Sequence, residues 1–295
     1  MQLTTPVDIS PSPLRISHET PLLLLGSCFT DHIGGKLQQA GFDILYNPFG
    51  TLYNPLSIAL ALQHALDDRE IGEEWLIHAN GLWHSWLHHS RYSHADKETC
   101  LAQCNETIHY AHQQLLKQPV VFITFGTAFV FRLINGDIPE CMKGQTVANC
   151  HKLPSFYFSR TLLSIQQIVD TYGTLLNHPL LADKPIVYTV SPIRHMADGA
   201  HGNQISKSTL LLTIEKLLLQ NPHHTYFPSY EIMLDELRDY RFYSRDMCHP
   251  SDLAIDIIWQ RFQDTFMSRE TQQRCFEEEK RARRAAHRPI INTEN

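Results

Sequence analysis

The sequence predicts an α/β fold, namely a three-layer α/β/α sandwich with a mostly parallel central sheet. Three continuous apolar runs, typical of strands buried on both faces, lie at residues 21–26, 120–125 and 185–190. Each run ends at a glycine or a turn-forming pair, as expected where a strand opens into a loop. Stretches with helical patterning separate the runs, and this alternation favours a parallel sheet wrapped by helices.

The remaining predicted elements continue the alternation of strands and helices, and segment 79–96 is the exception. A weaker strand is predicted at 42–46, and helices are predicted at 31–39, 55–66, 97–116, 162–176, 204–219 and after Pro250. Segment 79–96 is dense in His, Trp and Ser, fits no period, and is interpreted as an insertion over one face of the sheet. Since neither an internal repeat nor a Gly/Ser-rich linker is present, we expect one domain over 1–295, with its core at about 20–265 and a helical tail at about 266–295.

Composition narrows the class of protein. The chain has 295 residues, 43% hydrophobic and 19% charged, with a net charge of −6, which is ordinary for a globular protein. A basic footprint for nucleic acid is missing before residue 279, and neither a signal peptide nor a membrane span is indicated. The seven cysteines are odd in number and form no Cys-x-x-Cys pair, which favours reduced thiols. We therefore expect a cytoplasmic protein that binds neither nucleic acid nor membrane, and leave its oligomeric state open.

Ser27 is the predicted nucleophile. It follows Gly26 at the end of the first apolar run, and open α/β sheets bind their ligands at the carboxyl ends of strands. Glycine permits a sharp turn there, and a helix that starts at about Asp31 would point its N-terminal amides to the same place. A serine hydroxyl becomes an effective nucleophile only when a histidine takes its proton and a carboxylate orients that histidine.

Asp246 and His249 are the predicted partners of Ser27. They are three residues apart just before Pro250, and on one turn that spacing points both side chains the same way. The alternative is that Asp246 caps a turn and His249 is a surface histidine. The Gly-x-Ser-x-Gly elbow of α/β-hydrolases is absent from the sequence, which disfavours that fold.

An acyl-transfer site also needs donors for an oxyanion. The best-placed loops carry Gly50, Gly126 and Thr127, and Asn149 offers a side-chain amide. For the glycines the alternative is simple turn geometry.

Taken together, these motifs resemble the GSCFA domain, a bacterial family that is itself similar to a branch of the SGNH/GDSL hydrolase superfamily. The resemblance runs in matching order over about residues 20–265. It is carried by Gly-Ser-Cys-Phe-Thr (26–30), Asn-Pro-Phe-Gly-Thr-Leu-Tyr-Asn-Pro (47–55), Phe-Gly-Thr-Ala (125–128), Asn-Cys-His-Lys (149–152), Ser-Pro-Ile-Arg-His (191–195) and Asp-Met-Cys-His-Pro-Ser (246–251).

Membership of that superfamily implies a flavodoxin-like sheet, a serine after the first strand, an Asp-x-x-His near the C-terminus, and esterase chemistry. Two departures concern the site. Leu25-Gly26-Ser27 replaces Gly-Asp-Ser, and Gly126-Thr127-Ala128 replaces the Gly-x-Asn-Asp oxyanion block. Asn149 is then the amide side chain left to support the oxyanion.

Arg194 and His195 follow the third strand and are candidates for substrate binding, with a structural ion pair as the equal alternative. Cys28 and Cys248 are expected to point away from the site and pack, because neighbours along a strand or tight loop point apart.

The histidines of segment 79–96 lack a patterned carboxylate or cysteine partner, so we expect no metal and no cofactor. Trp83, Trp86 and Tyr92 are interpreted as a lid packed on the sheet that shapes an apolar acyl pocket.

These features predict a serine hydrolase, an esterase that cleaves a small O-acyl ester such as an O-acetyl group on a carbohydrate, through an acyl-enzyme on Ser27. An O-acyltransferase with the same triad is the first alternative. A catalytically silent binding module with the same fold is the second.

Overall fold

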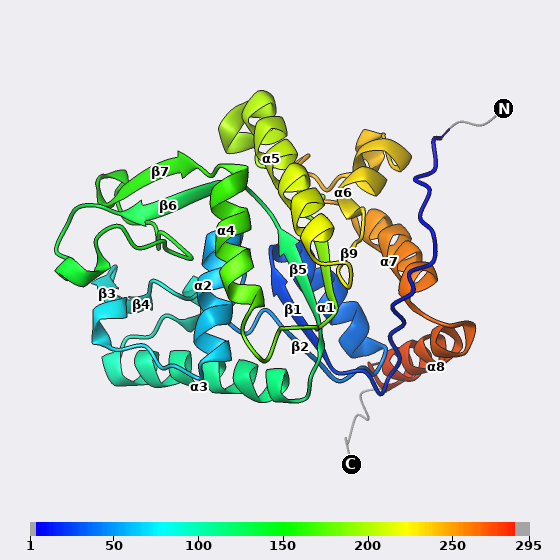
Figure 1. The fold of residues 1–295 in the computed structure, drawn as a ribbon, viewed down its shortest axis with the longest axis horizontal. Coiled ribbons are helices and arrows are strands. Elements are labelled where there is room, and N and C mark those ends of the chain that lie inside the picture. Colours follow the sequence, from blue (N-terminus) through cyan, green and yellow to red (C-terminus); the bar gives the residue numbers. More distant parts are fainter. Residues whose placement is uncertain (1–3, 287–295) are drawn as a thin grey trace, which may run out of the picture.

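The computed structural model describes residues 4–286, which form a central parallel sheet covered by helices on both faces (Figure 1). The sheet has the strand order β2-β1-β5-β8-β9, and every neighbouring pair is parallel. Its strands are β1 (Leu22–Gly26), β2 (Ile44–Tyr46), β5 (Val120–Phe125), β8 (Ile186–Val190) and β9 (Thr225–Tyr226). The predicted three-layer α/β/α sandwich is confirmed.

Two apolar cores lie on opposite faces of this sheet, because successive side chains of a strand point to opposite sides. Leu23 and Leu25 of β1 enter the first core, whereas Leu22 and Leu24 enter the second. The first core is covered by α2 (Pro55–Leu66), α3 (Lys97–Leu116), α4 (Ile165–Leu176) and α5 (Gly199–Gln220). The second is covered by α1 (Cys28–Gln39), α7 (Asp252–Phe266) and α8 (Arg269–Ala286).

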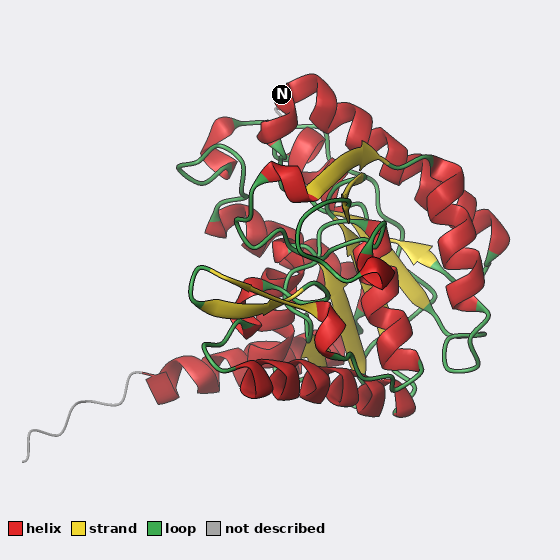
Figure 2. Cartoon of the chain, turned by 90° about the vertical axis from the view of Figure 1, so that its left-hand side faces the viewer, coloured by secondary structure: helices red, strands yellow, loops and turns green. Residues whose placement is uncertain are grey.

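Smaller elements complete the described chain (Figure 2). Antiparallel hairpins are formed by β3 (Leu76–Ala79) with β4 (Leu82–Ser85) and by β6 (Phe129–Leu133) with β7 (Phe158–Leu162). The single turn α6 (Ser229–Glu231) continues into a π-helix at Ile232–Glu236. Short 3₁₀ helices lie at Glu73–Trp75, Ser90–Tyr92, Glu140–Met142, Ser155–Tyr157, Met196–Asp198 and Tyr240–Phe242.

Three predicted helices begin elsewhere in the structure, and the one expected at 204–219 begins at Gly199. The first helix begins at Cys28 rather than Asp31, because Ser27 is its N-cap. The helix expected at 162–176 begins at Ile165, where Ser164 and Gln167 form a capping box, and the residues before it belong to β7. Residues 287–295 of the predicted tail lie outside the described residues.

The insertion at 79–96 does not lie over the sheet as one lid. Trp86 is fully buried against the β6–β7 hairpin, with its ring centroid 6.1 Å from that of Phe158. Trp83 and Tyr92 pack instead on the first core. Within residues 4–286 no helix combines the length and apolarity that a membrane span requires.

The strand order places a crevice at the carboxyl ends of β1 and β5. From β1 the chain continues through α1 on one face to β2, and from β2 through α2 and α3 on the other face to β5. Where the connections that follow two neighbouring strands run to opposite faces of a parallel sheet, the strand ends diverge and leave a crevice. Open parallel sheets bind their ligands at such a switch point. Gly26 and Phe125 are the last residues of these two strands.

Gly26 is required at this point by close packing. Its φ is +145°, and a Cβ would lie 2.3 Å from the carbonyl oxygen of Thr124 on β5. We predict that Gly26→Ala lowers the free energy of unfolding by about 3 kcal/mol or more, from strain plus overlap. The control is Gly35→Ala in α1, where a Cβ meets nothing within 4 Å and stability should rise by up to about 1 kcal/mol. Equal urea midpoints for Gly26→Ala and the parent chain would contradict this reading.

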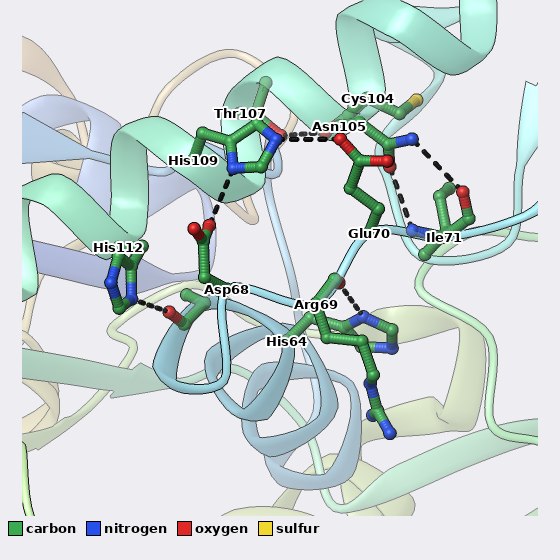
Figure 3. Close-up of polar contacts among 11 residues, drawn as sticks. His64, Asp68, Arg69, Glu70, Ile71, Cys104, Asn105, Thr107, His109 and His112 are labelled. Atoms are coloured by element: carbon green, nitrogen blue, oxygen red, sulfur yellow. Dashed lines mark hydrogen bonds and ion pairs between the residues drawn. The ribbon is translucent and has the colours of Figure 1, made fainter.

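The loop at 68–71, which follows α2, is held against α3 by a histidine and an asparagine of that helix (Figure 3). His109 contacts Asp68 through Nδ1 at 2.7 Å and Glu70 through Nε2 at 2.9 Å. Asn105 accepts from the Ile71 amide at 2.9 Å and donates to the Ile71 carbonyl at 3.1 Å. A charged imidazole can donate to both carboxylates at once.

Glu70, followed by Asp68, raises the pKa of His109 above its ordinary value. A raised pKa in the folded state stabilises the fold below the unfolded pKa, and this contribution is lost as pH rises through the folded pKa. His109→Gln should therefore lower the melting temperature at about pH 5.5 and leave it nearly unchanged at about pH 8.5. The exposed His201 serves as the control through His201→Gln. A loss that is the same at both pH values would show that the charge on His109 contributes nothing.

Candidate active site at the β1–β5 crevice

Ser27 lies where β1 ends and α1 begins. It is the N-cap of α1 with φ −70° and ψ 175°, and its side chain is 1% exposed. An N-cap serine ordinarily accepts a hydrogen bond from the first turn of its helix. Here Oγ makes no such bond and has no hydrogen-bond partner among the described residues. The buried hydroxyl is therefore not held by a hydrogen bond to the described residues.

Asp246 and His249 are brought together in the loop before α7. Asp246 Oδ1 accepts from the amides of Cys248 at 2.9 Å and His249 at 3.0 Å, and Oδ2 lies 2.5 Å from His249 Nδ1. The His249 amide, the Cys248 amide and then the imidazole lower the pKa of Asp246 to about 2. Asp246 therefore caps the turn with one oxygen and orients the imidazole with the other. Because an ionised carboxylate only accepts, Nδ1 donates to Asp246, and Nε2 is the ring nitrogen left to act as an acceptor in the neutral imidazole.

The nearest side-chain partner of that acceptor is Cys28, not Ser27. Its Sγ lies 3.7 Å from His249 Nε2. The expectation that Cys28 points away is wrong, because Cys28 is the first residue of a helix and strand alternation does not apply to it. Burial, followed by the charge of Asp31, raises the pKa of the Cys28 thiol to about 11. The sulfur beside the imidazole is thus a protonated thiol.

The three predicted backbone donors are already engaged. The Gly50 amide donates to the Asn47 carbonyl at 2.8 Å, and the amides of Gly126 and Thr127 donate to the Tyr53 carbonyl at 2.8 and 2.9 Å. These bonds fit the alternative of turn geometry. They also place Gly126 against the site, since a Cβ at Gly126 would lie 3.3 Å from Ser27 Cβ.

Asn149 lines a neighbouring cavity. Its Oδ1 accepts from the His151 amide at 2.7 Å, whereas its Nδ2 has no partner among the described residues. The cavity has a volume of about 540 Å³ and borders the site through Tyr53 and Thr127. Its other lining residues are Asn54, Phe129, Phe131, Val147, Ala148, Cys150, Arg160, His195, Ala197 and Asp198.

The two residues predicted to bind substrate face different cavities. His195 lines the 540 Å³ cavity, edge-on to Tyr53 at 5.9 Å. Burial first, and then the charge of Lys207, lower the pKa of His195 to about 4, so it is neutral at pH 7. Arg194 lines a second cavity of about 260 Å³. Its guanidinium donates to the Met247 carbonyl at 3.2 Å and its amide to the Cys248 carbonyl at 3.1 Å, so Arg194 supports the loop of His249.

Two groups of residues near the site were not identified from the sequence. The first supports β1, where Asn47 Oδ1 accepts from the Gly26 amide at 2.9 Å and Asn47 Nδ2 donates to Asp31 at 2.7 Å. The second is a polar stripe on α5 that includes the buried Lys207. A lysine within an apolar helical pattern was the available signal for the second, and for Asn47 the signal was its place in the motif at 47–55, to which no role was assigned.

The histidines of segment 79–96 serve local contacts. His88 is fully buried between Ser85 and Thr107, at 2.9 and 3.0 Å, and His84 contacts Ser93 at 2.5 Å. Throughout residues 4–286, His, Cys, Asp and Glu side chains nowhere gather in threes as potential metal ligands.

The fold and this site define a class of protein, an open parallel α/β sandwich in which the first helix begins opposite an aspartate–histidine pair. Within that class the chain belongs to the GSCFA family, whose sequence model matches residues 21–262. Comparison with curated proteins found no match, and comparison with solved structures found none either.

Proposed function

We propose that the protein is a serine hydrolase that cleaves a small O-acyl ester through an acyl-enzyme on Ser27. The observation that carries the proposal is the Asp246–His249 contact of 2.5 Å, which leaves Nε2 facing the start of α1, 3.7 Å from Cys28 Sγ. The uncommitted hydroxyl of Ser27 adds support, and so does GSCFA membership. A relation to the SGNH/GDSL hydrolases belongs to the same proposal and is supported by the parallel sheet and the serine after its first strand.

The chemistry follows from these three side chains. Ser27 Oγ rotates toward His249, gives its proton to Nε2 and attacks the ester carbonyl carbon. The tetrahedral intermediate collapses as the alkoxide leaves with the proton from Nε2. Water then loses a proton to Nε2 and attacks the acyl-enzyme, which releases the acid and restores Ser27. Asp246 holds the imidazole in the required tautomer throughout.

The first turn of α1 is our proposed oxyanion support. The first amides of a helix have no intrahelical acceptor, and the macrodipole adds positive character there. The amides of Cys28 and Phe29 belong to this first turn, and both lower the pKa of the Cys28 thiol. Asn149 Nδ2 is the additional donor from the cavity side.

The 540 Å³ cavity is the proposed substrate pocket. Its one cation, Arg160, is ion-paired with Asp198 and stacked 3.9 Å above the Phe129 ring, so no charge is left for an anionic ligand. Aromatic walls and amide groups suit a neutral ester, and a carbohydrate O-acetyl group fits that description.

A thiol nucleophile, Cys28, is the second candidate for the same reaction. The distance of 3.7 Å between its Sγ and His249 Nε2 favours it. The raised pKa of the thiol opposes it, because the thiolate is the attacking form.

Substitutions at the two neighbours distinguish these candidates. We predict that Ser27→Ala lowers kcat for p-nitrophenyl acetate by about 10³-fold or more, because the attacking atom is lost. Cys28→Ala should keep kcat within about fivefold, and Cys141→Ala is the matched control at an exposed cysteine. A larger loss of kcat in Cys28→Ala than in Ser27→Ala would identify the Cys28 thiol as the nucleophile instead.

A further inference from the structure

Lys207 is a buried cation at the carboxyl ends of two strands. Its side chain is 1% exposed, and Nζ donates to the carbonyls of Gly126 and Ser191, each at 2.7 Å. These carbonyls directly follow β5 and β8. No carboxylate pairs with Lys207 among the described residues. Burial of an ammonium without a counter-ion is costly, so its retention calls for a function.

Lys207 belongs to a polar stripe on α5, a helix that packs on the sheet against β8 and β9 (Figure 1). Asn203, Ser206 and Lys207 have the i, i+3, i+4 spacing of one helix face. Asn203 Oδ1 accepts from the His195 amide at 2.9 Å, and Ser206 Oγ accepts from the Ala128 amide at 2.8 Å. The stripe therefore fixes the loops that follow both strands, and Lys207 alone bonds to both of them.

The ammonium also acts on the neighbouring groups by its charge. It lowers the pKa of the Cys28 thiol and that of His195, and its Nζ lies 5.5 Å from the centre of the Tyr230 ring. Burial lowers its own pKa to about 7, and a negative charge at Cys28 would oppose that change. Lys207 is close to the start of α1, because its Nζ binds the carbonyl of Gly126, where a Cβ would lie 3.3 Å from Ser27 Cβ.

We propose that Lys207 is a positioning residue of the Ser27 site, which fixes Gly126 against Ser27 and holds a positive charge behind the first turn of α1. The inference rests on the proposed function. In that reaction negative charge develops on the attacking serine and on the tetrahedral oxygen, and a fixed buried charge stabilises it more strongly than water does. Lys207 acts through the backbone and its field, and does not touch the substrate.

Kinetics provide the first test. At about pH 6.5, where Lys207 is largely charged, Lys207→Met should lower kcat for p-nitrophenyl acetate at least about tenfold with KM within about twofold. The control is Lys216→Met, an exposed lysine on the same helix, with both melting temperatures recorded. A folded Lys207→Met protein with kcat within about twofold of the parent would overturn the proposal.

A titration independent of ester turnover provides the second test. The ε-carbon signals of ¹³C-labelled lysines report each pKa, and that of Lys207 is assigned by its loss in Lys207→Met or Lys207→Gln. Cys28→Asp adds a carboxylate at the first turn of α1, where an acidic residue is favourable. The pKa of Lys207 should then rise by about one unit, whereas Cys141→Asp should leave it unchanged.

An unchanged Lys207 titration in Cys28→Asp would overturn the proposal even if the parent chain shows no esterase activity. Absence of turnover in the parent chain would instead count against the Ser27 chemistry. The two failures are therefore distinguishable.

Discussion

The close approach of β1 to β5 at Gly26 determines where everything else in the site can lie. No side chain fits between Gly26 and the Thr124 carbonyl, and the Ser27 amide donates to that same carbonyl at 3.3 Å. The chain therefore turns into α1 directly at the crevice between the two strands. Ser27 and Cys28 are carried there by the backbone, before any side-chain contact is made.

Segments far apart in the sequence then supply the rest of the site. The loop before α7 brings His249, already oriented by Asp246, and Arg194 supports that loop from the turn after β8. Lys207 joins the ends of β5 and β8 from the side of the first core. Arg194 and Lys207 contribute through hydrogen bonds to backbone carbonyls, whereas Asp246 orients His249 by a contact between side chains.

Those features of the fold and the site that depend on a local pattern of residues could be predicted from the sequence. Buried strands such as 120–125 are continuous apolar runs, and the three-residue spacing of Asp246 and His249 was enough to foresee their contact. Features that depend on the exact start of a helix, or on a hydrogen-bond acceptor far away in the sequence, could not be predicted from it. Cys28 was misjudged because the start of α1 was placed too late, and the Gly126 amide is engaged by a carbonyl more than 70 residues away. The β6–β7 hairpin was missed because β6 opens with three apolar residues in a row and β7 has three exposed residues in a row, so neither strand alternates.

The central claim is that Ser27, and not its neighbour, carries the acyl group. A crystal structure of the chain treated with an alkyl fluorophosphonate tests this most directly. We predict phosphorus bonded to Ser27 Oγ, with the phosphonyl oxygen within hydrogen-bond distance of the amides of Cys28 and Phe29. An adduct on Cys28 Sγ, or an unmodified Ser27 after prolonged treatment, would contradict it.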